Sequence, residues 1–358
     1  MTNLVDRVEF ASLLNEPNAA DASNVKYFVL DLDSFYPNQR ADVAEWIRRQ
    51  PVPVIGLGSG NRSFIDHFDV VVENEEQLSL LIPAIEAHPK ASAILVQVTR
   101  VTSDLPVNSA LVIESLGYGT LQGGVEFKAW LSDFKTQRPE RDFDHHGQKN
   151  AENHVESSFK ISDEHLLTQK VIVDRFDARV QIRLNSPVNR NALSAMMRDD
   201  LTEAFKLVAM DSTIEEAHVW GEGPCFSAGG DLTEFGLMRD LAEAHRIRQA
   251  RMPARYLAQE AHRYTFHLHG ACVGAGIEIP AFARHVTATP DTFFQLPEVA
   301  MGLIPGAGGC VSIPRRIGRQ RMNWLALTGI RLSVEEAVAW GLVDRQVEAW
   351  YDDHLEQG

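Results

Sequence analysis

The chain contains 358 residues, 44% of them hydrophobic, which is enough for one large domain or two ordinary domains with complete cores. A net charge of −15 argues against binding to a phosphate backbone, which needs a basic face, so nucleic acid is not an expected partner. No apolar run approaches the length of a membrane span, and the N-terminus lacks the basic and apolar regions of a secretory signal, so we expect no membrane association and a cytoplasmic location.

The first half of the chain alternates strand patterns with helix patterns. Apolar runs predict strands at 26–35, 52–58, 68–73 and 93–99, and amphipathic stretches predict helices at 41–50 and 74–88. This alternation is typical of an α/β domain built on a largely parallel sheet. The glycine-rich stretch 115–124 has neither a phosphate-binding lysine nor GxGxxG spacing, so it predicts a loop rather than a nucleotide site.

A polar stretch divides the chain. Residues 136–158 are nearly without aliphatic side chains and form the predicted linker between an N-terminal α/β domain at 1–135 and a second domain at 159–358. A faint similarity of pattern links 80–99 to 204–223. It leaves two interpretations open, a degenerate copy of the second domain's fold or a chance likeness between two α/β segments.

The second domain begins with a predicted pair of strands at 171–185, followed by Ser194 as a predicted helix N-cap. The helix would bury one face, made of Met197, Leu201, Phe205 and Val208. Residues 217–223 predict a buried strand that delivers the motif FSAGGDL (226–232) at its carboxyl end, where open α/β sheets place ligands. A helix rich in arginine is predicted over 238–261.

Two glutamates lie in glycine- and alanine-rich surroundings, Glu278 in GACVGAGIEIP and Glu298 in FFQLPEVAMGLIPGAGG. Glycine and alanine let the main chain approach a bound carbonyl group, and a helix beginning near Ala275 would direct free N–H groups outward. Ala228 could supply a second amide. Chemistry through a thioester enolate needs such a pair of amides to stabilise the oxygen and carboxylates to move protons at the neighbouring carbons.

Five motifs occur in one order along the second domain. They are SPVNRNALS (186–194), FSAGGDL (226–232), GACVGAGIE (270–278), QLPEVAMGLIPGAGG (295–309) and LTGIRLSVEEAVAWGLVDRQV (327–347). In this order they resemble the crotonase superfamily, and most closely enoyl-CoA hydratase/isomerase. The resemblance implies an α/β fold, with a crotonase-like repeated ββα core in the second domain, preceded by the smaller N-terminal α/β domain.

The resemblance also implies roles for individual residues. The amides of Ala228 and Ala275 would form the oxyanion hole, and Glu278 and Glu298 would be the two catalytic carboxylates, one activating water for attack at the β-carbon and the other exchanging a proton at the α-carbon. Further substrate contacts are implied for Gly229, Gly230, Asp231, Gly274 and Gly306. Asp231 would shape its loop, and glycines 306–309 would let a helix N-terminus approach the acyl group. Because both glutamates are present, the resemblance favours hydration of an enoyl-CoA.

The same resemblance implies coenzyme A as part of the substrate, no further cofactor, a place in fatty acid metabolism, and a homo-oligomer, trimer or hexamer. We expect no metal site. The acyl pocket would be built by variable apolar residues such as Phe235, Leu237 and Met238. Arginines on the helix predicted at 238–261 could meet CoA phosphates or form a solvated face; they are Arg246, Arg248, Arg251 and Arg255.

Other interpretations stay open. The chain could be a double-bond isomerase that uses mainly Glu298, or a catalytically silent interaction protein on the same fold. Glu278 could form a structural ion pair, with Arg284 as partner, and Glu298 could simply begin a helix. The cysteines are expected to be small packing residues rather than nucleophiles; they are Cys225, Cys272 and Cys310.

One departure from the family pattern concerns the end of the chain. The family continues past the last motif with a helical region that closes over the active site and builds a trimer, whereas this chain reaches Gly358 soon after Val347. We therefore expect the N-terminal half to take over this task, either by covering the pocket or by forming the subunit interface.

Overall fold

The computed structural model describes residues 4–5, 25–34, 40–58, 62–137 and 169–349. Most of the predicted linker lies outside the described residues, and its first two positions, 136 and 137, belong to a helix. None of the helices in the described part of the chain combines the length and apolar composition needed to cross a bilayer.

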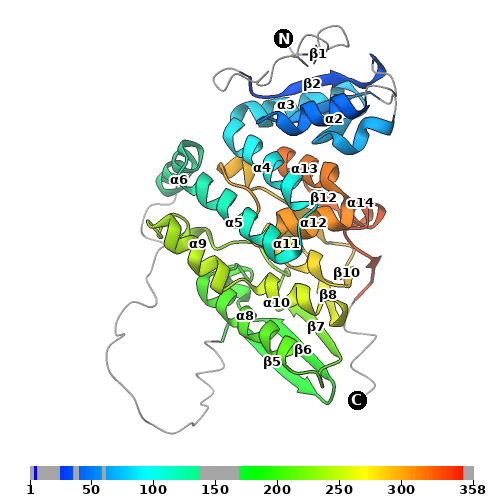
Figure 1. The fold of residues 1–358 in the computed structure, drawn as a ribbon. Helices are drawn as coiled ribbons and strands as arrows, with labels where there is room; N and C mark the ends of the chain where they lie inside the picture. The colour runs from blue at the N-terminus through cyan, green and yellow to red at the C-terminus, as the bar shows by residue number, and fades with distance from the viewer. Residues whose placement is uncertain (1–3, 6–24, 35–39, 59–61, 138–168, 350–358) are drawn as a thin grey trace.

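The N-terminal end is a four-stranded parallel sheet in the order β1-β2-β3-β4, with two long helices packed beside it (Figure 1). The strands are β1 (Leu4–Val5), β2 (Phe28–Asp31), β3 (Val54–Leu57) and β4 (Val70–Val72), and the helices are α2 (Arg40–Arg49) and α3 (Glu75–Ala87). Short 3₁₀ helices lie at η1 (Leu32–Ser34) and η3 (Arg62–His67). The parallel α/β arrangement predicted from the alternating pattern is thereby confirmed.

Three further helices follow and lie against the C-terminal half. They are α4 (Pro89–Thr102), α5 (Val107–Gln122) and α6 (Val125–Gln137). The prediction of a strand at 93–99 is wrong, because this run lies inside α4. The helix is buried on more than one face, with Leu95, Val96 and Val98 all covered, so its apolar run imitates a buried strand.

The prediction of a loop at 115–124 is also wrong, because most of this stretch forms the C-terminal part of α5. Gly117 serves close packing between helices, whereas Gly123 and Gly124 lie in the turn between α5 and α6. A Cβ on Gly117 would lie 2.8 Å from Val98 Cγ2, so glycine lets α5 approach α4 closely. Helix α5 is thereby held near the loops that follow the strands of the second half.

The C-terminal half contains a six-stranded sheet, ordered β13-β10-β8-β7-β6-β5, and a three-stranded sheet, ordered β12-β11-β9. The strands are β5 (Val171–Phe176), β6 (Arg179–Leu184), β7 (Glu216–Gly221), β8 (Tyr264–Leu268), β9 (Ala271–Val273), β10 (His285–Ala288), β11 (Phe293–Gln295), β12 (Leu332–Ser333) and β13 (Arg345–Gln346). Only β5 with β6 and β11 with β12 pair in antiparallel fashion among these described strands. The mixed sheets agree with the predicted crotonase-like α/β fold.

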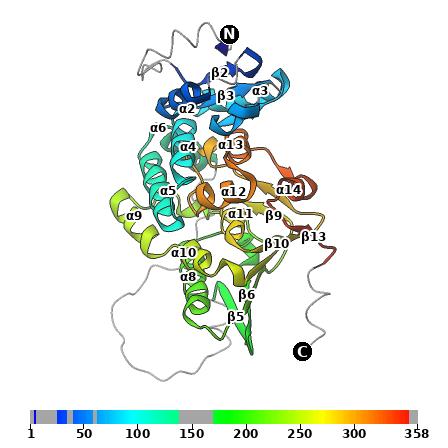
Figure 2. The same ribbon diagram turned by 45° about the vertical axis from the view of Figure 1, so that its right-hand side comes forward.

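Helices cover these sheets and connect their strands (Figure 2). They are α8 (Ala195–Met210), α9 (Leu241–Ala250), α10 (Pro253–Gln259), α11 (Ala275–Glu278), α12 (Gly309–Ile317), α13 (Arg319–Thr328) and α14 (Val334–Trp340). Short 3₁₀ helices lie at η5 (Pro187–Asn189), η6 (Leu232–Glu234), η7 (Ala261–Arg263), η8 (Pro280–Phe282) and η9 (Val299–Met301). The helix predicted over 238–261 is in fact α9 and α10, because Pro253 disfavours helix at the residue before it and begins a new one.

The predicted start of α8 is confirmed. Ser194 accepts a hydrogen bond from the N–H of Met197, and the four residues of the predicted face are buried. This face packs toward β6, β7 and β8, which also carry buried side chains such as Phe266. The core therefore fixes the strands whose carboxyl ends carry the site.

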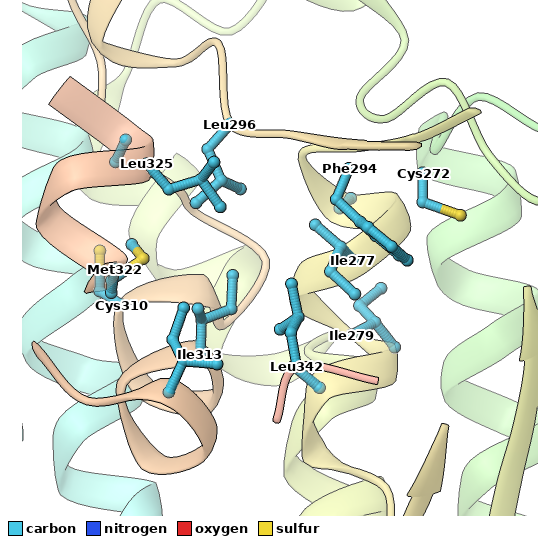
Figure 3. Packing of buried hydrophobic residues seen from close by; sticks show 14 of the residues in the cluster. Cys272, Ile277, Ile279, Phe294, Leu296, Cys310, Ile313, Met322, Leu325 and Leu342 are labelled. Atoms are coloured by element: carbon cyan, nitrogen blue, oxygen red, sulfur yellow. The ribbon is translucent and has the colours of Figure 1, made fainter. Parts of the chain in front are cut away.

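The largest apolar cluster extends across α11, α12, α13 and β11 (Figure 3). Figure 3 shows Cys272 beside Phe294 and Ile277, and Cys310 near Met322. All three cysteines are buried and free, and burial raises the pKa of each thiol. These surroundings agree with the predicted packing role.

A buried acidic group joins the N-terminal sheet to the C-terminal half. Asp69, before β4, is fully buried and accepts hydrogen bonds from Arg100 Nε of α4 at 2.8 Å and from Arg319 Nη1 of α13 at 2.7 Å. It also accepts the N–H of Val54 at 2.8 Å. Two arginines from separate elements thus depend on one carboxylate.

Asp69→Ala should lower the free energy of unfolding by about 3 kcal/mol, because it leaves two buried guanidinium groups without their shared carboxylate. Equilibrium unfolding in urea measures the change. The matched control is Glu45→Ala, whose exposed ion pairs with Arg48 and Arg49 span 3.9 and 3.8 Å and should contribute less than about 1 kcal/mol. Equal effects of the two variants would contradict a joining role for Asp69.

Candidate active site

One pocket of about 580 Å³ brings together every site residue predicted from the sequence. These residues are Ala228, Gly229, Gly230, Asp231, Gly274, Ala275, Glu278, Glu298 and Gly306. They come from the loop after β7, the turn between β9 and α11, and the segment that leads from β11 to α12. Residues as far apart in the sequence as Ala228 and Gly306 therefore share one cavity, because the carboxyl ends of neighbouring strands meet there.

The amide groups at the pocket differ from the predicted pair. The N–H of Ala228 donates to the carbonyl oxygen of Arg190 at 2.9 Å, so it is not free to bind an oxyanion. The N–H groups of Gly230 and Ala275 have no hydrogen-bond acceptor among the described residues. The prediction for Ala228 is therefore corrected to Gly230, two residues further along the same loop, while Ala275 keeps a free amide at the first position of α11.

The motif SPVNRNALS holds this loop in place. Asn191 is fully buried, and its side-chain amide donates to the carbonyl oxygens of Glu222 and Cys225, at 2.9 and 3.1 Å. Ser227 Oγ donates to the carbonyl oxygen of Asn191 at 2.8 Å and accepts the N–H of Gly229 at 3.2 Å. This network explains why Ala228 turns its amide inward, which the sequence pattern alone does not reveal.

Asp231 shapes the end of the loop, as the resemblance implied. Its Oδ1 accepts the N–H of Thr233 at 3.0 Å and the Thr233 hydroxyl at 2.7 Å, which caps η6. The side chain is thus used within its own turn.

Glu278 is buried at the end of α11, with only 2% of its surface exposed. Its Oε2 accepts the N–H groups of Ala307 at 2.7 Å and Gly309 at 2.9 Å. Burial raises the pKa of Glu278 to about 7, although these backbone N–H groups act in the opposite direction. No ion pair involves Glu278 among the described residues, and Arg284 is exposed, so the structural ion-pair interpretation is wrong.

Glu298 faces the same pocket just before η9. Its Oε2 is buried and has no hydrogen-bond partner among the described residues. Burial, and next to it the charge of Glu278, raises the pKa of the Glu298 carboxyl well above its ordinary value. A carboxyl group held in this way keeps its proton at a pH where an exposed glutamate is ionised.

Gly274 separates the two carboxyl groups. A Cβ at this position would collide with Oε1 of Glu298 and would lie 3.7 Å from Oε1 of Glu278. The residue also has a φ of +49°, in the region that favours glycine. Glycine is therefore needed here for both backbone and space, and the two carboxyl groups reach one small volume across it.

A third buried carboxylate, which the sequence analysis did not find, approaches from α5. Glu114 is fully buried and accepts the N–H of Gly308 at 2.7 Å and the N–H of Cys310 at 2.8 Å. The amides at the start of α12 are thus bound to carboxylates. This differs from the implied approach of that helix N-terminus to the acyl group.

The N-terminal half covers the pocket, which is one of the two tasks expected of it from the sequence. Helices α5 and α6 contribute Tyr118, Gln122, Trp130 and Phe134 to its wall. The ring of Tyr118 lies over Gly306, where a Cβ would come within 2.5 Å of Cδ2. Gly306 is therefore required by an aromatic ring from the other half of the chain.

Aromatic side chains form much of the wall on the α6 side. The rings of Trp130 and Phe134 stack with centroids 5.1 Å apart, and Phe235 meets Trp130 edge to face at 6.2 Å. Leu237 and Met238, predicted to join Phe235, are exposed and do not line this pocket. Their loop turns outward after η6, at Gly236 with a φ of +76°.

The arginines of α9 and its flank fall into two groups. Arg246 is exposed and pairs with Glu243, as a solvated face predicts. Arg248 instead lies beneath α5, where it donates to Ser115 Oγ at 3.0 Å and Gln122 Oε1 at 3.1 Å and also lines the pocket. Arg251 and Arg198 line the pocket as well. The described residues contain no cluster of His, Cys, Asp or Glu side chains suited to a metal ion.

Several known proteins are similar to this chain. A family model described as Enoyl-CoA hydratase/isomerase matches residues 180–357. The chain is 30% identical over 174 residues to the 2,3-dehydroadipyl-CoA hydratase of Escherichia coli, a match that covers 49% of this chain and 68% of that protein. It is 30% identical over 181 residues to the mitochondrial Delta(3,5)-Delta(2,4)-dienoyl-CoA isomerase of Mus musculus, covering 46% and 54%.

One more curated relative and one solved structure are also similar to this chain. A probable enoyl-CoA hydratase of Bacillus subtilis is 31% identical over 176 residues, with 48% of this chain and 66% of that protein covered. Among solved structures, an enoyl-CoA hydratase/isomerase from Mycobacterium paratuberculosis gives a TM-score of 0.47 at 28% identity, covering 50% of this chain and 73% of that chain. The chain thus spans about half to two thirds of the length of these curated relatives, and the family model matches its C-terminal half.

Glu298→Gln should stabilise the folded chain, increasingly so as the pH rises. The folded-state pKa lies above the ordinary value of 4.5, so the folded chain retains a proton that the unfolded chain loses, and stability falls as pH rises above about 4.5. Glutamine has no such titration. We expect a gain of about 1 to 3 kcal/mol at pH 8 and almost none at pH 4.5, measured by urea unfolding at both pH values. Glu335→Gln, on an exposed turn of α14, is the control and should change stability little at either pH. A gain that is the same at both pH values would rule out this electrostatic cause.

Proposed function

The chain belongs to the enoyl-CoA hydratase/isomerase family, and on this premise we propose that it is an enoyl-CoA hydratase-like lyase that adds water to an enoyl-CoA or removes it in reverse. The observation that carries the proposal is the meeting of two buried carboxyl groups across Gly274 with two free amides in one pocket. An enolate reaction needs both kinds of group at adjacent atoms.

In the proposed mechanism, the N–H groups of Gly230 and Ala275 bind the thioester oxygen. This oxygen becomes negatively charged when a nucleophile adds at the β-carbon, and two fixed amides stabilise the charge more than water does, because they are already oriented. Neither N–H has an acceptor among the residues that the structure describes, which supports this role. The oxyanion hole proposed here therefore replaces Ala228 with Gly230 and keeps Ala275.

The environments of the two glutamates support different proton roles. Glu278, with a pKa of about 7 and two backbone donors on Oε2, is suited to hold negative charge and to accept a proton from the attacking water. Glu298, whose pKa is raised further from its ordinary value by burial and by Glu278, is suited to donate its proton to the α-carbon. Water oxygen bonds to the β-carbon, its proton passes to Glu278, and the Glu298 proton completes the new C–H bond.

Binding of coenzyme A needs local positive charge, because the chain as a whole is acidic. Arg198 and Arg251 line the pocket and are the proposed contacts for its phosphates. We propose that CoA enters only as part of the substrate and that no further cofactor takes part. A cytoplasmic location, a role in fatty acid metabolism and a homo-oligomeric state complete the proposal.

Turnover should collapse in Glu278→Gln and in Glu298→Gln. Loss of the enoyl-thioester absorbance over short, medium, branched and aromatic enoyl-CoAs measures hydration, and each variant should lose about 10² to 10⁴ in kcat. In the unaltered chain kcat should rise with pH through about 7, as Glu278 ionises, and fall again when Glu298 loses its proton. Migration of the double bond without water addition would favour an isomerase, and binding without turnover would favour a silent scaffold.

Ala275→Pro should remove one oxyanion donor with little change to the fold. The residue is the first of α11, a position where proline is tolerated, and its N–H has no acceptor among the described residues. We expect a loss of about 10² to 10³ in kcat. Ala275→Gly keeps the N–H and is the matched control. Circular dichroism checks the fold of both, and equal activity of the folded variants would disprove the donor role.

A further inference from the structure

Four successive amides at residues 307–310 donate alternately to two carboxylates. Ala307 and Gly309 donate to Oε2 of Glu278, at 2.7 and 2.9 Å. Gly308 and Cys310 donate to Glu114, one to each oxygen, at 2.7 and 2.8 Å. The turn before α12 is thus hydrogen-bonded on two sides, to the catalytic Glu278 and to Glu114 of the N-terminal half.

Glu114 has no part in the proposed proton transfers, yet it is fully buried. A buried carboxylate normally destabilises a protein unless charge or hydrogen bonds compensate it. The two backbone N–H groups and the nearby Arg248 of α9 provide this compensation. The other titratable groups that act on this cluster are Glu278, Glu298 and Cys310, together with Tyr118 one turn along α5.

We propose that Glu114 is a positioning residue for the reaction proposed above, on which this inference rests. It holds the turn at 306–310 so that Ala307 and Gly309 keep their amides on Glu278, and it links the proton content of the two catalytic carboxyl groups to a charge on α5.

The geometry explains how a residue outside the reaction can act on it. The four amides share one short backbone segment, so a rotation that releases Gly308 or Cys310 from Glu114 also turns Ala307 and Gly309 away from Glu278. Without those two donors Glu278 would hold negative charge less readily. The same turn contains Gly306 beneath Tyr118. Loss of the hydrogen bonds to Glu114 therefore also moves the pocket wall.

Electrostatics add a second link between Glu114 and the two catalytic carboxyl groups. Burial, then the charge of Glu278, raises the pKa of Glu114, and the charge of Glu114 is one of the causes that raise the pKa of Glu298. The three carboxyl groups therefore titrate as a coupled set. Removing the charge at position 114 should therefore let Glu298 ionise at lower pH, whereas loss of the amide donors of Ala307 and Gly309 should make Glu278 ionise at higher pH.

Glu114→Gln is the decisive variant, since its side chain keeps one acceptor oxygen and presents an NH₂ group where the second acceptor stood. We expect kcat to fall at least tenfold while KM changes less than threefold, with the limb of Glu278 moved to higher pH and the limb of Glu298 moved to lower pH. Glu114→Asp keeps the charge but is too short to reach both amides, so it should lower kcat without moving the limbs in the same way.

The matched control is Glu126→Gln. Glu126 of α6 also accepts two backbone N–H groups, those of Lys90 and Ala91 at 2.9 and 3.0 Å, but it grips the start of α4 and does not line the pocket. Its substitution should lower the thermal midpoint slightly and leave kcat and the pH profile unchanged. Equal kinetic effects at positions 114 and 126 would overturn the proposal.

A readout that does not need turnover separates this inference from the proposed function. Carboxyl-carbon NMR titration of chain labelled at glutamate, with Glu278→Gln and Glu298→Gln for assignment, follows both catalytic groups directly. In Glu114→Gln, Glu298 should titrate at lower pH and Glu278 at higher pH than in the unaltered chain. Unchanged titration would refute the role of Glu114 whatever the activity. An unaltered chain that hydrates no enoyl-CoA would refute the proposed function instead. If Glu114→Gln does not fold, Glu114→Asp under the same titration decides, because a positioning role requires the Glu278 titration to move.

Discussion

The turn at 306–310 is the point on which the arrangement of the pocket depends. Its amides face two buried carboxylates that arrive from α11 and from α5, elements separated by more than 150 positions in the sequence. Each carboxylate needs the amides because burial without donors is costly, and the turn needs the carboxylates because four adjacent N–H groups have no helical partner at the start of α12. These hydrogen bonds therefore hold α5 of the N-terminal half in a fixed position relative to α11 and the turn at 306–310.

Two acidic side chains of the pocket and the buried Glu114 beside it lie close together, which opposes folding at neutral pH. The backbone donors that compensate this burial differ among the three carboxyl groups. This difference separates the proton affinities of the three groups. Glu278 has two backbone donors on one oxygen, Glu114 has one on each, and Glu298 has a buried oxygen with no partner among the described residues. Similar carboxyl groups in unequal surroundings acquire different proton affinities, and this separation distinguishes an acid from a base.

Much of the site could be predicted from local sequence, and the predictions that were wrong failed for physical reasons. The positions of Glu278, Glu298 and Gly274 in one pocket could be predicted because their motifs are short and depend on neighbours within a few residues. Ala228 was chosen over Gly230 because the direction of an amide depends on Asn191 and Ser227, which form a network across three loops. No pattern of types in FSAGGDL indicates which amide turns inward.

Glu114 was missed for a different reason. Its partners lie 194 and 196 positions away, and the stretch that follows it resembled a loop because of its glycines. Once 107–122 is known to be helical, Glu114, Tyr118 and Gln122 fall four residues apart on one face, which is a signal that sequence could have given. Likewise, the strand predicted inside α4 reflects a helix buried on several faces, where helical periodicity disappears.

The position of the covering helices has a consequence for specificity. In this chain α5 and α6 precede the catalytic motifs, yet they supply Tyr118, Trp130 and Phe134 to the pocket wall. A pocket wall needs side chains at given places and does not depend on the order in which the chain reaches them. The carboxylates and amides are set by the motifs of the second half, whereas one side of the wall is set by α5 and α6. Changes in these helices can therefore alter which acyl group fits while leaving Glu278 and Glu298 in place, provided that Glu114 keeps its two amides.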